Sequence, residues 1–330
     1  MALAEQLTTR EQRIQSFLGQ CAMQHATRHA IPADASFRSY ERLDKDGHHF
    51  ILMNAPPSHE DIAPFVKVCH LLNRLGLSAP SMFCKDVEQG FLLLEDLGRL
   101  SFNHYLRDYP EEEVTLYTAA LEVQLVLRDY GNAITYGSLP PYDLDVYLRE
   151  ILLYADWYLP TLLEGKALQA AQASYLEIWK ELLKTSGLTC SQPVLRDFHA
   201  DNLMWLPQRA GAARAGLLDF QDALLGDSTY DLVSLLEDAR RDVSPETQTA
   251  ILTHYIEATG EEEQAFRARY ALMAAQRNSK VIGIFHRLAT RDGKKHYLDF
   301  VPRVQRLLAG NLQHPALAPL AEWHAEYVSK

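Results

Sequence analysis

The stretch LRDFHADN at residues 195–202 decides the fold of this chain, together with the stretch GLLDF at residues 216–220. The first stretch contains Asp197 and, five residues later, Asn202. The second places Asp219 at the end of a short apolar run, twenty-two residues after Asp197. An isolated Asp-x4-Asn pair is weak evidence, because it occurs by chance in many chains. The same pair followed at this distance by an apolar run ending in Asp is a specific pattern.

These residue types suit phosphoryl transfer from ATP. Asp197 would orient an attacking hydroxyl and accept its proton, a task that needs little base strength because the transition state is loose. The amide oxygen of Asn202 and the carboxylate of Asp219 are hard oxygen donors, which Mg²⁺ prefers. The pattern therefore predicts a catalytic base at Asp197, a magnesium site at Asn202 and Asp219, and ATP and Mg²⁺ as cofactors.

The composition limits the class of partner. The chain has 330 residues, is 47% apolar and carries a net charge of −11, which argues against nucleic acid and against an anionic membrane surface. Its four cysteines are scattered, so neither a zinc site nor a disulfide framework is expected. No signal-peptide core and no run of ~20 apolar residues is present. We expect a cytoplasmic protein, with a monomer favoured.

The chain changes character near residue 98. Before it, a helix is expected over residues 4–29 and another over 59–76, with short strands between and after them, one pair joined by the turn signal Asp46-Gly47. After it, helical periodicity dominates. The fold class expected is α+β, with a β-rich lobe at 1–97 and a mostly helical lobe at 98–330. The later helices are expected at 111–130, 142–159, 166–185, 229–242, 246–258, 262–288 and 296–309.

The layout and motifs resemble the aminoglycoside phosphotransferase and choline kinase family, whose fold is protein-kinase-like and bilobal. Within it the chain is most similar to the bacterial anomeric N-acetylmuramate/N-acetylglucosamine kinases of cell-wall recycling. The resemblance spans residues 34–294. Besides the motifs above, it rests on the stretches DASFR (34–38), ILMNAPP (51–57), LEDLG (94–98), LDFQDA (218–223) and RDGK (291–294).

The resemblance implies a nucleotide site in the first lobe. Its residues would be a loop between the first two strands, which contacts the phosphates, and a hinge, which reads adenine through its backbone. The family's lysine on the third strand is absent here, and Arg38 is a candidate to replace its charge. The expected nucleotide-binding residues are Ser36, Phe37, Arg38 and Ser39 in the loop, and Glu95 and Leu97 in the hinge.

A structural role is expected for Asp231. It follows Ser228 by three residues at the start of a helix, which is the pattern of a capping box. In the resembled family an Asp at this place can also brace the catalytic loop by accepting backbone N–H groups. Both roles remain open from the sequence.

The resemblance implies an amino-sugar substrate, phosphorylated at the anomeric hydroxyl. Trp157 and Glu150 lie on one expected helix. Trp157 could stack on the apolar face of a sugar ring, and Glu150 could accept hydrogen bonds from its hydroxyls. Core packing is an alternative for Trp157. Arg291 and Lys294 form a basic cluster that suits the lactyl carboxylate of N-acetylmuramate, or alternatively a solvated helix end. Two other functions stay open: an aminoglycoside or choline/ethanolamine kinase, and a non-catalytic nucleotide-binding pseudokinase.

Overall fold

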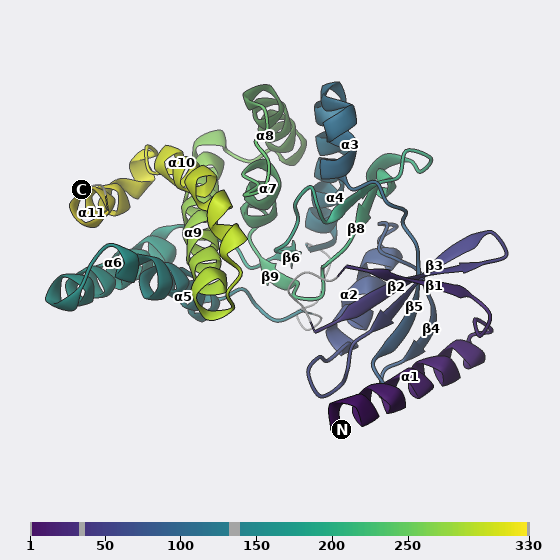
Figure 1. The fold of residues 1–330 in the computed structure, drawn as a ribbon. Helices are drawn as coiled ribbons and strands as arrows, with labels where there is room; N and C mark the ends of the chain where they lie inside the picture. Colours follow the sequence, from purple (N-terminus) through teal and green to yellow (C-terminus); the bar gives the residue numbers. More distant parts are fainter. Residues whose placement is uncertain (1, 33–36, 132–138, 329–330) are drawn as a thin grey trace. The chain divides into compact units, whose positions relative to one another are not determined.

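The computed structural model describes residues 2–32, 37–131 and 139–328, and the chain divides into two units (Figure 1). The first unit comprises Met1–Ser101 and Met204–Asp222. The second comprises Phe102–Leu203 and Ala223–Lys330. Within the described residues, no helix is both long and apolar enough to cross a bilayer.

The first unit is built on a five-stranded antiparallel sheet in the order β1-β2-β3-β5-β4. The turn between β2 and β3 is Asp46-Gly47, and both residues have positive φ, as a two-residue hairpin of this type requires. Helix α1 (Ala2–Gln20) covers one face of the sheet, where Phe17 stacks on Phe91 at 5.4 Å. The strands are β1 (Thr27–Ile31), β2 (Ser39–Lys45), β3 (His48–Asn54), β4 (Met82–Asp86) and β5 (Phe91–Glu95), and helix α2 (Ala63–Arg74) follows β3.

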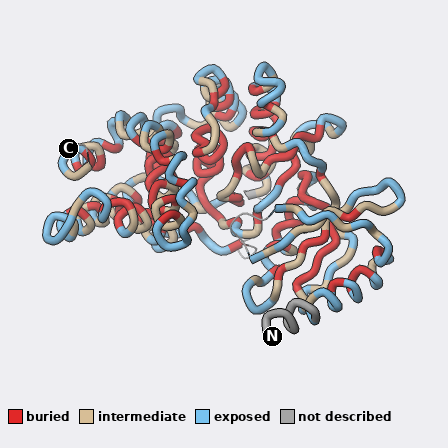
Figure 2. Tube along the Cα trace, viewed as in Figure 1, coloured by how far each residue is buried: buried red, intermediate tan, exposed pale blue. Residues whose placement is uncertain are grey.

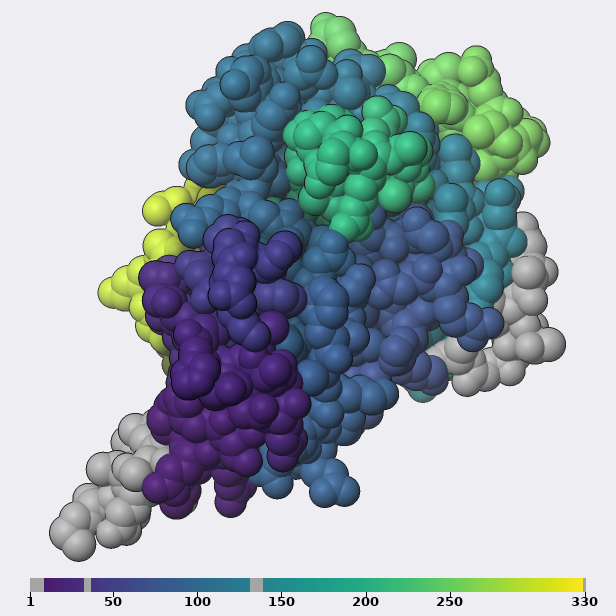
Figure 3. Space-filling model, turned by 90° about the vertical axis from the view of Figure 1, so that its right-hand side faces the viewer, coloured from purple at the N-terminus to yellow at the C-terminus, as the bar shows by residue number. Residues whose placement is uncertain are grey.

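The chain returns to the first unit after the catalytic-loop motif. Strands β7 (Leu203–Trp205) and β8 (Ala215–Leu217) pair with each other. The Trp205 N–H donates to the Leu100 carbonyl at 2.8 Å, and the Leu217 N–H donates to Ser78 at 2.8 Å. Figure 3 shows the segment between these strands on the surface, in green. These backbone bonds explain why a single boundary at 97/98 misassigns Met204–Asp222, which belongs to the first unit.

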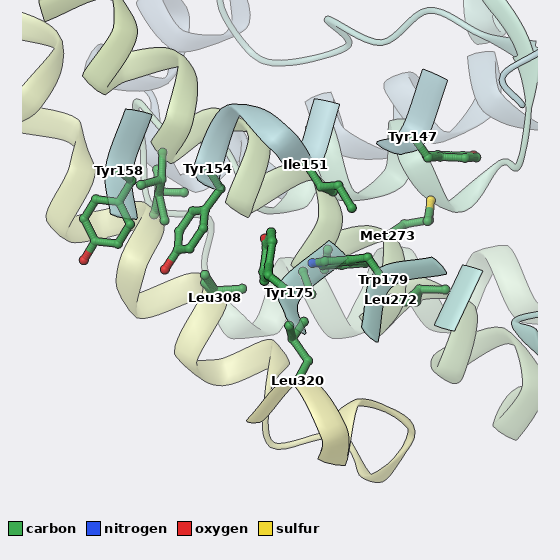
Figure 4. Close-up of a cluster of buried hydrophobic side chains, with 14 of the residues drawn as sticks. Tyr147, Ile151, Tyr154, Tyr158, Tyr175, Trp179, Leu272, Met273, Leu308 and Leu320 are labelled. Atoms are coloured by element: carbon green, nitrogen blue, oxygen red, sulfur yellow. The ribbon is translucent and has the colours of Figure 1, made fainter. Parts of the chain in front are cut away.

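The second unit is mostly helical and contains a large apolar core. Helix α9 (Glu263–Arg291) is its longest element, and its middle third is buried (Figure 2). Aromatic side chains of α5, of the π-helical turn η2 and of α6 meet α9 and the C-terminal helices in this core (Figure 4). Two short strands, β6 (Gln192–Val194) and β9 (Leu224–Gly226), pair beside it.

The remaining helical elements of the second unit follow the sequence order. The α-helices are α3 (Phe102–Asp108), α4 (Glu113–Gly131), α5 (Leu144–Leu153), α6 (Gly165–Thr185), α7 (Thr229–Leu236), α8 (Pro245–Thr259), α10 (Val301–Asn311) and α11 (Ala318–Tyr327). Short turns are η1 (Pro110–Glu112), η2 (Tyr154–Tyr158), η3 (Leu159–Thr161), η5 (Lys295–Phe300) and η6 (Pro315–Leu317), while η4 (Gly211–Arg214) belongs to the first unit.

The expected α+β class, a small β-rich part and a larger helical part, is confirmed. The helix expected over residues 4–29 is wrong at its C-terminal end, because α1 ends at Gln20 and Thr27–Ile31 forms the edge strand β1. That strand is largely solvent-exposed and carries Arg28 and His29, so it lacks the apolar alternation by which a strand is recognised.

Candidate active site

Strand β6 leads into the catalytic-loop motif, where Asp197 and Asn202 are half-buried in the second unit. The Asn202 side-chain amide donates to the Asp197 backbone carbonyl at 3.0 Å, and the Asn202 N–H donates to His199 at 2.9 Å. Since the Nδ2 group is engaged inside the loop, the Oδ1 oxygen is the atom that Asn202 can offer to a ligand. The loop therefore holds both residues in one small turn.

Asp231 holds the start of this loop. One of its carboxylate oxygens accepts the Leu195 N–H at 2.6 Å, and the other accepts the Arg196 N–H at 2.8 Å. Burial raises the pKa of Asp231 to about 6, against the opposing effect of these backbone bonds. Ser228, the residue before α7, makes no side-chain capping bond. The contacts are thus those of a loop brace and not of a capping box.

Glu150 lies on α5 in the second unit and is buried. Its carboxylate accepts hydrogen bonds from Arg196 at 2.5 Å, Lys280 at 2.8 Å and Gln276 at 3.0 Å, and from the Tyr142 hydroxyl. Burial opposes its ionisation, but Lys280 and Arg196 lower its pKa to about 2. Because four protein groups already bind this carboxylate, the structure disfavours direct contact of Glu150 with a sugar.

The other predicted sugar residues lie elsewhere in the second unit. Trp157 is half-buried in the π-helical turn η2, a type of turn that is frequent at functional sites. Arg291 ends α9, is exposed and pairs with Asp292 at 2.7 Å, and Lys294 follows it. Eleven residues of helix, about 16 Å, separate Lys280 from Arg291. The structure therefore does not bring Glu150 and the Arg291–Lys294 cluster together.

Asp219 belongs to the first unit and lies two residues after the end of β8. Its φ is +57°, a left-handed conformation that is uncommon for a residue other than glycine. Its side chain is exposed, and one carboxylate oxygen accepts the Gln221 amide at 2.8 Å. An exposed carboxylate in a strained backbone position is typical of a ligand-binding residue.

A cavity of about 470 Å³ lies within the first unit, and Asp219 is part of its wall. Ile51 of β3 and Leu94 of β5 line it from the sheet, and Phe65 of α2 lines it as well. Phe65 stacks on Phe220 at 4.9 Å, which ties α2 to the residue after Asp219. A largely apolar cavity with a few acidic side chains in its wall suits a flat base with polar groups at one end.

The loop before β2 is fastened to the segment before α2 by two adjacent contacts. Phe37 stacks on His59 with ring centroids 4.8 Å apart, and Arg38 pairs with Glu60 at 3.1 Å. Burial raises the pKa of the half-buried Tyr40, on which the charges of Arg38, Asp219 and Glu60 also act. Tyr40 lines the same cavity as Asp219, and Arg38 stands two residues before Tyr40 in the chain. Ser36 lies outside the described residues, and Ser39 accepts the Asn54 amide at 3.1 Å.

The hinge after β5 is held by charged side chains. Arg42 on β2 donates two hydrogen bonds to Asp96, at 2.5 and 3.0 Å, and a third to the Gly98 carbonyl at 3.0 Å. Asp96 in turn accepts the Gly98 N–H at 2.9 Å. Glu95 binds Ser81 and Arg209 through its side chain, and Leu97 is buried. The predicted hinge residues thus border the cavity.

Several residues of the site were not predicted from the sequence. Ile51 occupies the face of β3 that lines the cavity, and its partner across the strand pair is Arg42. Lys280 and Gln276 stand in a polar run, residues 276–280, in the middle of a helix whose apolar positions predict burial. Buried polar residues need hydrogen-bond partners, so this polar run was the feature of the sequence that could have predicted the contacts to Glu150.

Comparison with known proteins identifies the family of this chain. The sequence profile of the phosphotransferase enzyme family matches residues 27–271. The N-acetylmuramate/N-acetylglucosamine kinase of Caulobacter vibrioides is 36% identical, with 97% of each chain covered. The enzyme of the same name from Pseudomonas aeruginosa is 38% identical over 88% of this chain and 86% of that one.

Among solved structures, choline kinase LicA from Streptococcus pneumoniae matches with a TM-score of 0.62 and 14% identity, covering 92% of this chain and 99% of that chain. An ADP-bound aminoglycoside phosphotransferase matches with a TM-score of 0.62 and 13% identity, covering 92% and 98%. The fold is therefore that of the aminoglycoside and choline kinases, and the expected small-molecule kinase is confirmed. With the profile over most of its length and these relatives beside it, the chain belongs to the phosphotransferase enzyme family.

Proposed function

We propose that this protein is a Mg-ATP-dependent kinase that phosphorylates N-acetylmuramate and N-acetylglucosamine at the anomeric hydroxyl. The observation that carries the proposal is the similarity, at 35–38% identity over 87–97% of this chain, to relatives that bear the name of this activity. The catalytic-loop geometry supports it, since Asp197 and Asn202 are held together in one braced turn.

The nucleotide is proposed to bind in the cavity of the first unit. Its apolar walls suit adenine, and the hinge at Glu95–Leu97 suits backbone recognition of the base edge. Arg38, with its Glu60 partner, is proposed to supply the cation for the phosphates that a third-strand lysine would otherwise provide. A guanidinium presents several N–H donors in a plane, which suits phosphate oxygens.

Magnesium is proposed to bind Asn202 and Asp219. Both side chains fit this ion, because each offers a hard oxygen and Mg²⁺ keeps waters and phosphate oxygens for its other positions. When bound, the ion would neutralise charge on the phosphates. Asp197 would orient the sugar O1 hydroxyl and accept its proton as O1 bonds to the γ-phosphorus and the bond to the ADP oxygen breaks.

The sugar is proposed to contact Trp157 through its apolar ring face. The lactyl carboxylate of N-acetylmuramate is proposed to bind near Arg291 and Lys294. These roles are supported by residue chemistry and by the half-buried position of Trp157 in the π-helical turn. The cytoplasmic location and the monomeric state stay predictions.

An ADP-release assay tests the proposed function. The purified protein receives Mg-ATP and one acceptor at a time: N-acetylmuramate, N-acetylglucosamine, kanamycin or choline, with a no-acceptor control and GTP in parallel. We expect acceptor-dependent ADP release with the two amino sugars. ADP release only with kanamycin or choline would mean that the substrate is an aminoglycoside or choline and not an amino sugar. Nucleotide binding without release for any acceptor would support a pseudokinase.

A further inference from the structure

Arg196, the residue before the proposed base, is bound through its N–H, its carbonyl and its guanidinium group. Its φ is +71°, a left-handed value that costs free energy for a residue with a Cβ and persists only where the surroundings impose it. Its N–H donates to Asp231 at 2.8 Å, and its carbonyl accepts the Ser234 hydroxyl at 3.2 Å. Its guanidinium donates to Glu150 at 2.5 Å.

Glu150 is the centre of the side-chain contacts that reach Arg196. We call Glu150, Arg196 and Lys280, with the uncharged donors Gln276 and Tyr142, the Glu150 network. It joins α5, the catalytic loop and α9, which are separated by up to 130 residues in the chain. Lys280 also donates to the Tyr230 hydroxyl at 2.9 Å, so its ammonium group is fixed by two partners.

The charges of the network favour a positioning role over a purely stabilising one. Burying an ion pair costs desolvation free energy that roughly cancels the attraction, so a buried pair by itself adds little stability. What such a pair does fix is geometry, because a displaced partner leaves a buried charge unpaired. The side chain of Arg196 is thereby fixed where the backbone continues directly into Asp197.

We propose that the Glu150 network is a positioning device for the catalytic base: Lys280 fixes the Glu150 carboxylate, Glu150 holds the Arg196 side chain, and Arg196 so held orients Asp197. The inference rests on the proposed function in one respect, the role of Asp197 as base. Glu150 and Lys280 are positioning residues, acting through the loop and not through contact with substrate.

Steady-state kinetics of Glu150→Gln and Lys280→Met test the device. A misplacement of about 1 Å costs on the order of 10²-fold in rate, so we expect kcat to fall about 10²-fold with KM for ATP and for the sugar within threefold. Lys280→Arg, which keeps the cation, should recover most of kcat. Arg128→Met is the matched control: it removes an ion pair with Glu261 in the same unit and outside the Glu150 network, and should leave kcat unchanged.

Two outcomes would overturn the inference. A rise in KM for the sugar with kcat retained would make Glu150 a sugar contact. Wild-type kcat and KM in folded Glu150→Gln and Lys280→Met, with folding checked by circular dichroism, would make the network dispensable.

The Asp197→Asn background separates this inference from the proposed function. If the network acts through Asp197, Lys280→Met should lower kcat by less than about threefold when Asp197 is already replaced by Asn. Equal costs in both backgrounds would overturn the inference. A normal rate in Asp197→Asn itself would instead overturn the base assignment.

Hydrogen exchange gives a readout besides activity: the Leu195 and Arg196 amides should exchange faster in Lys280→Met than in Arg128→Met. Equal exchange in the two variants would contradict the device.

Discussion

Arg196 and Asp219 share a left-handed backbone and differ in everything that surrounds them. Arg196, in the second unit, is bound through its N–H, its carbonyl and its guanidinium. Asp219, in the first unit, is exposed, and its carboxylate accepts the amide of Gln221, two residues away. Contacts within the protein offset the backbone strain at Arg196. The strained backbone at Asp219 instead places a carboxylate in the wall of a cavity.

The two environments suit two different roles. A base needs a fixed geometry before substrate arrives, and contacts within the protein provide it. A metal ligand needs open lone pairs, so its carboxylate must be left free of strong protein partners. Substitutions near Arg196 should therefore act on kcat, and substitutions near Asp219 should act on Mg-nucleotide binding.

The largest expected effect is that of Asp197→Asn. Loss of the proposed general base and its orienting contact should lower kcat by on the order of 10²–10⁴-fold. Binding of Mg-ADP, measured by calorimetry, should remain within threefold of the wild type. Turnover within tenfold of the wild type would contradict the proposed role of Asp197.

Asp219→Ala should produce the complementary result. We expect kcat to fall by on the order of 10²–10³-fold, because Mg²⁺ loses a carboxylate ligand. Affinity for Mg-ADP should fall far more than affinity for ADP measured in excess chelator. Equal losses in the two titrations would assign Asp219 a structural role, and Gln221→Ala serves as a neighbouring control.

Glu150→Gln sharpens the comparison through its pH dependence. The pKa of Glu150 is lowered from 4.5 to about 2, so its stabilisation is present above pH 4.5 and is lost as the pH falls toward 2. The variant should lose on the order of 3 kcal/mol of unfolding free energy at pH 7, because Arg196 and Lys280 are left without the charge that they pair with. In urea unfolding, the difference from the wild type should shrink at pH 3. A difference independent of pH would mean that the charge of Glu150 is not what stabilises the fold.

Arg42→Met tests the hinge of the first unit. Removing three hydrogen bonds to Asp96 and Gly98 should loosen the segment that is proposed to read the base, and KM for ATP should rise about tenfold. KM for the sugar should not change. Arg28→Met, which breaks a pair with Glu41 in the same sheet, is the control. A similar rise in both variants would indicate a general weakening of the sheet.

The smallest and most selective effect concerns the basic cluster. Arg291→Ala and Lys294→Ala should lower kcat/KM for N-acetylmuramate about tenfold, because a charge-assisted hydrogen bond contributes roughly 1.5–3 kcal/mol. The neutral N-acetylglucosamine should be nearly unaffected. Parallel losses on the two sugars would make the cluster a structural helix end.

The sequence predicted the local parts of this arrangement well. Asp197, Asn202 and Asp231 lie within 35 residues, so their spacing in the chain largely determines their contacts. Contacts between residues far apart in the chain are harder to predict from the sequence. The bond between Glu150 and Lys280 joins residues 130 positions apart, and the three-residue strands β7 and β8 are too short to show periodicity. Those are the places where sequence reasoning missed the network and misassigned Met204–Asp222.

The central claim is tested most directly by identifying the product. The wild-type protein is incubated with Mg-ATP and N-acetylmuramate, and phosphorus NMR follows the fate of the γ-phosphate. The account predicts a new sugar-phosphate resonance coupled to the anomeric proton, equal in amount to the ADP formed, and none with Asp197→Asn over the same period. A phosphate ester at another hydroxyl, or inorganic phosphate without any sugar ester, would contradict it.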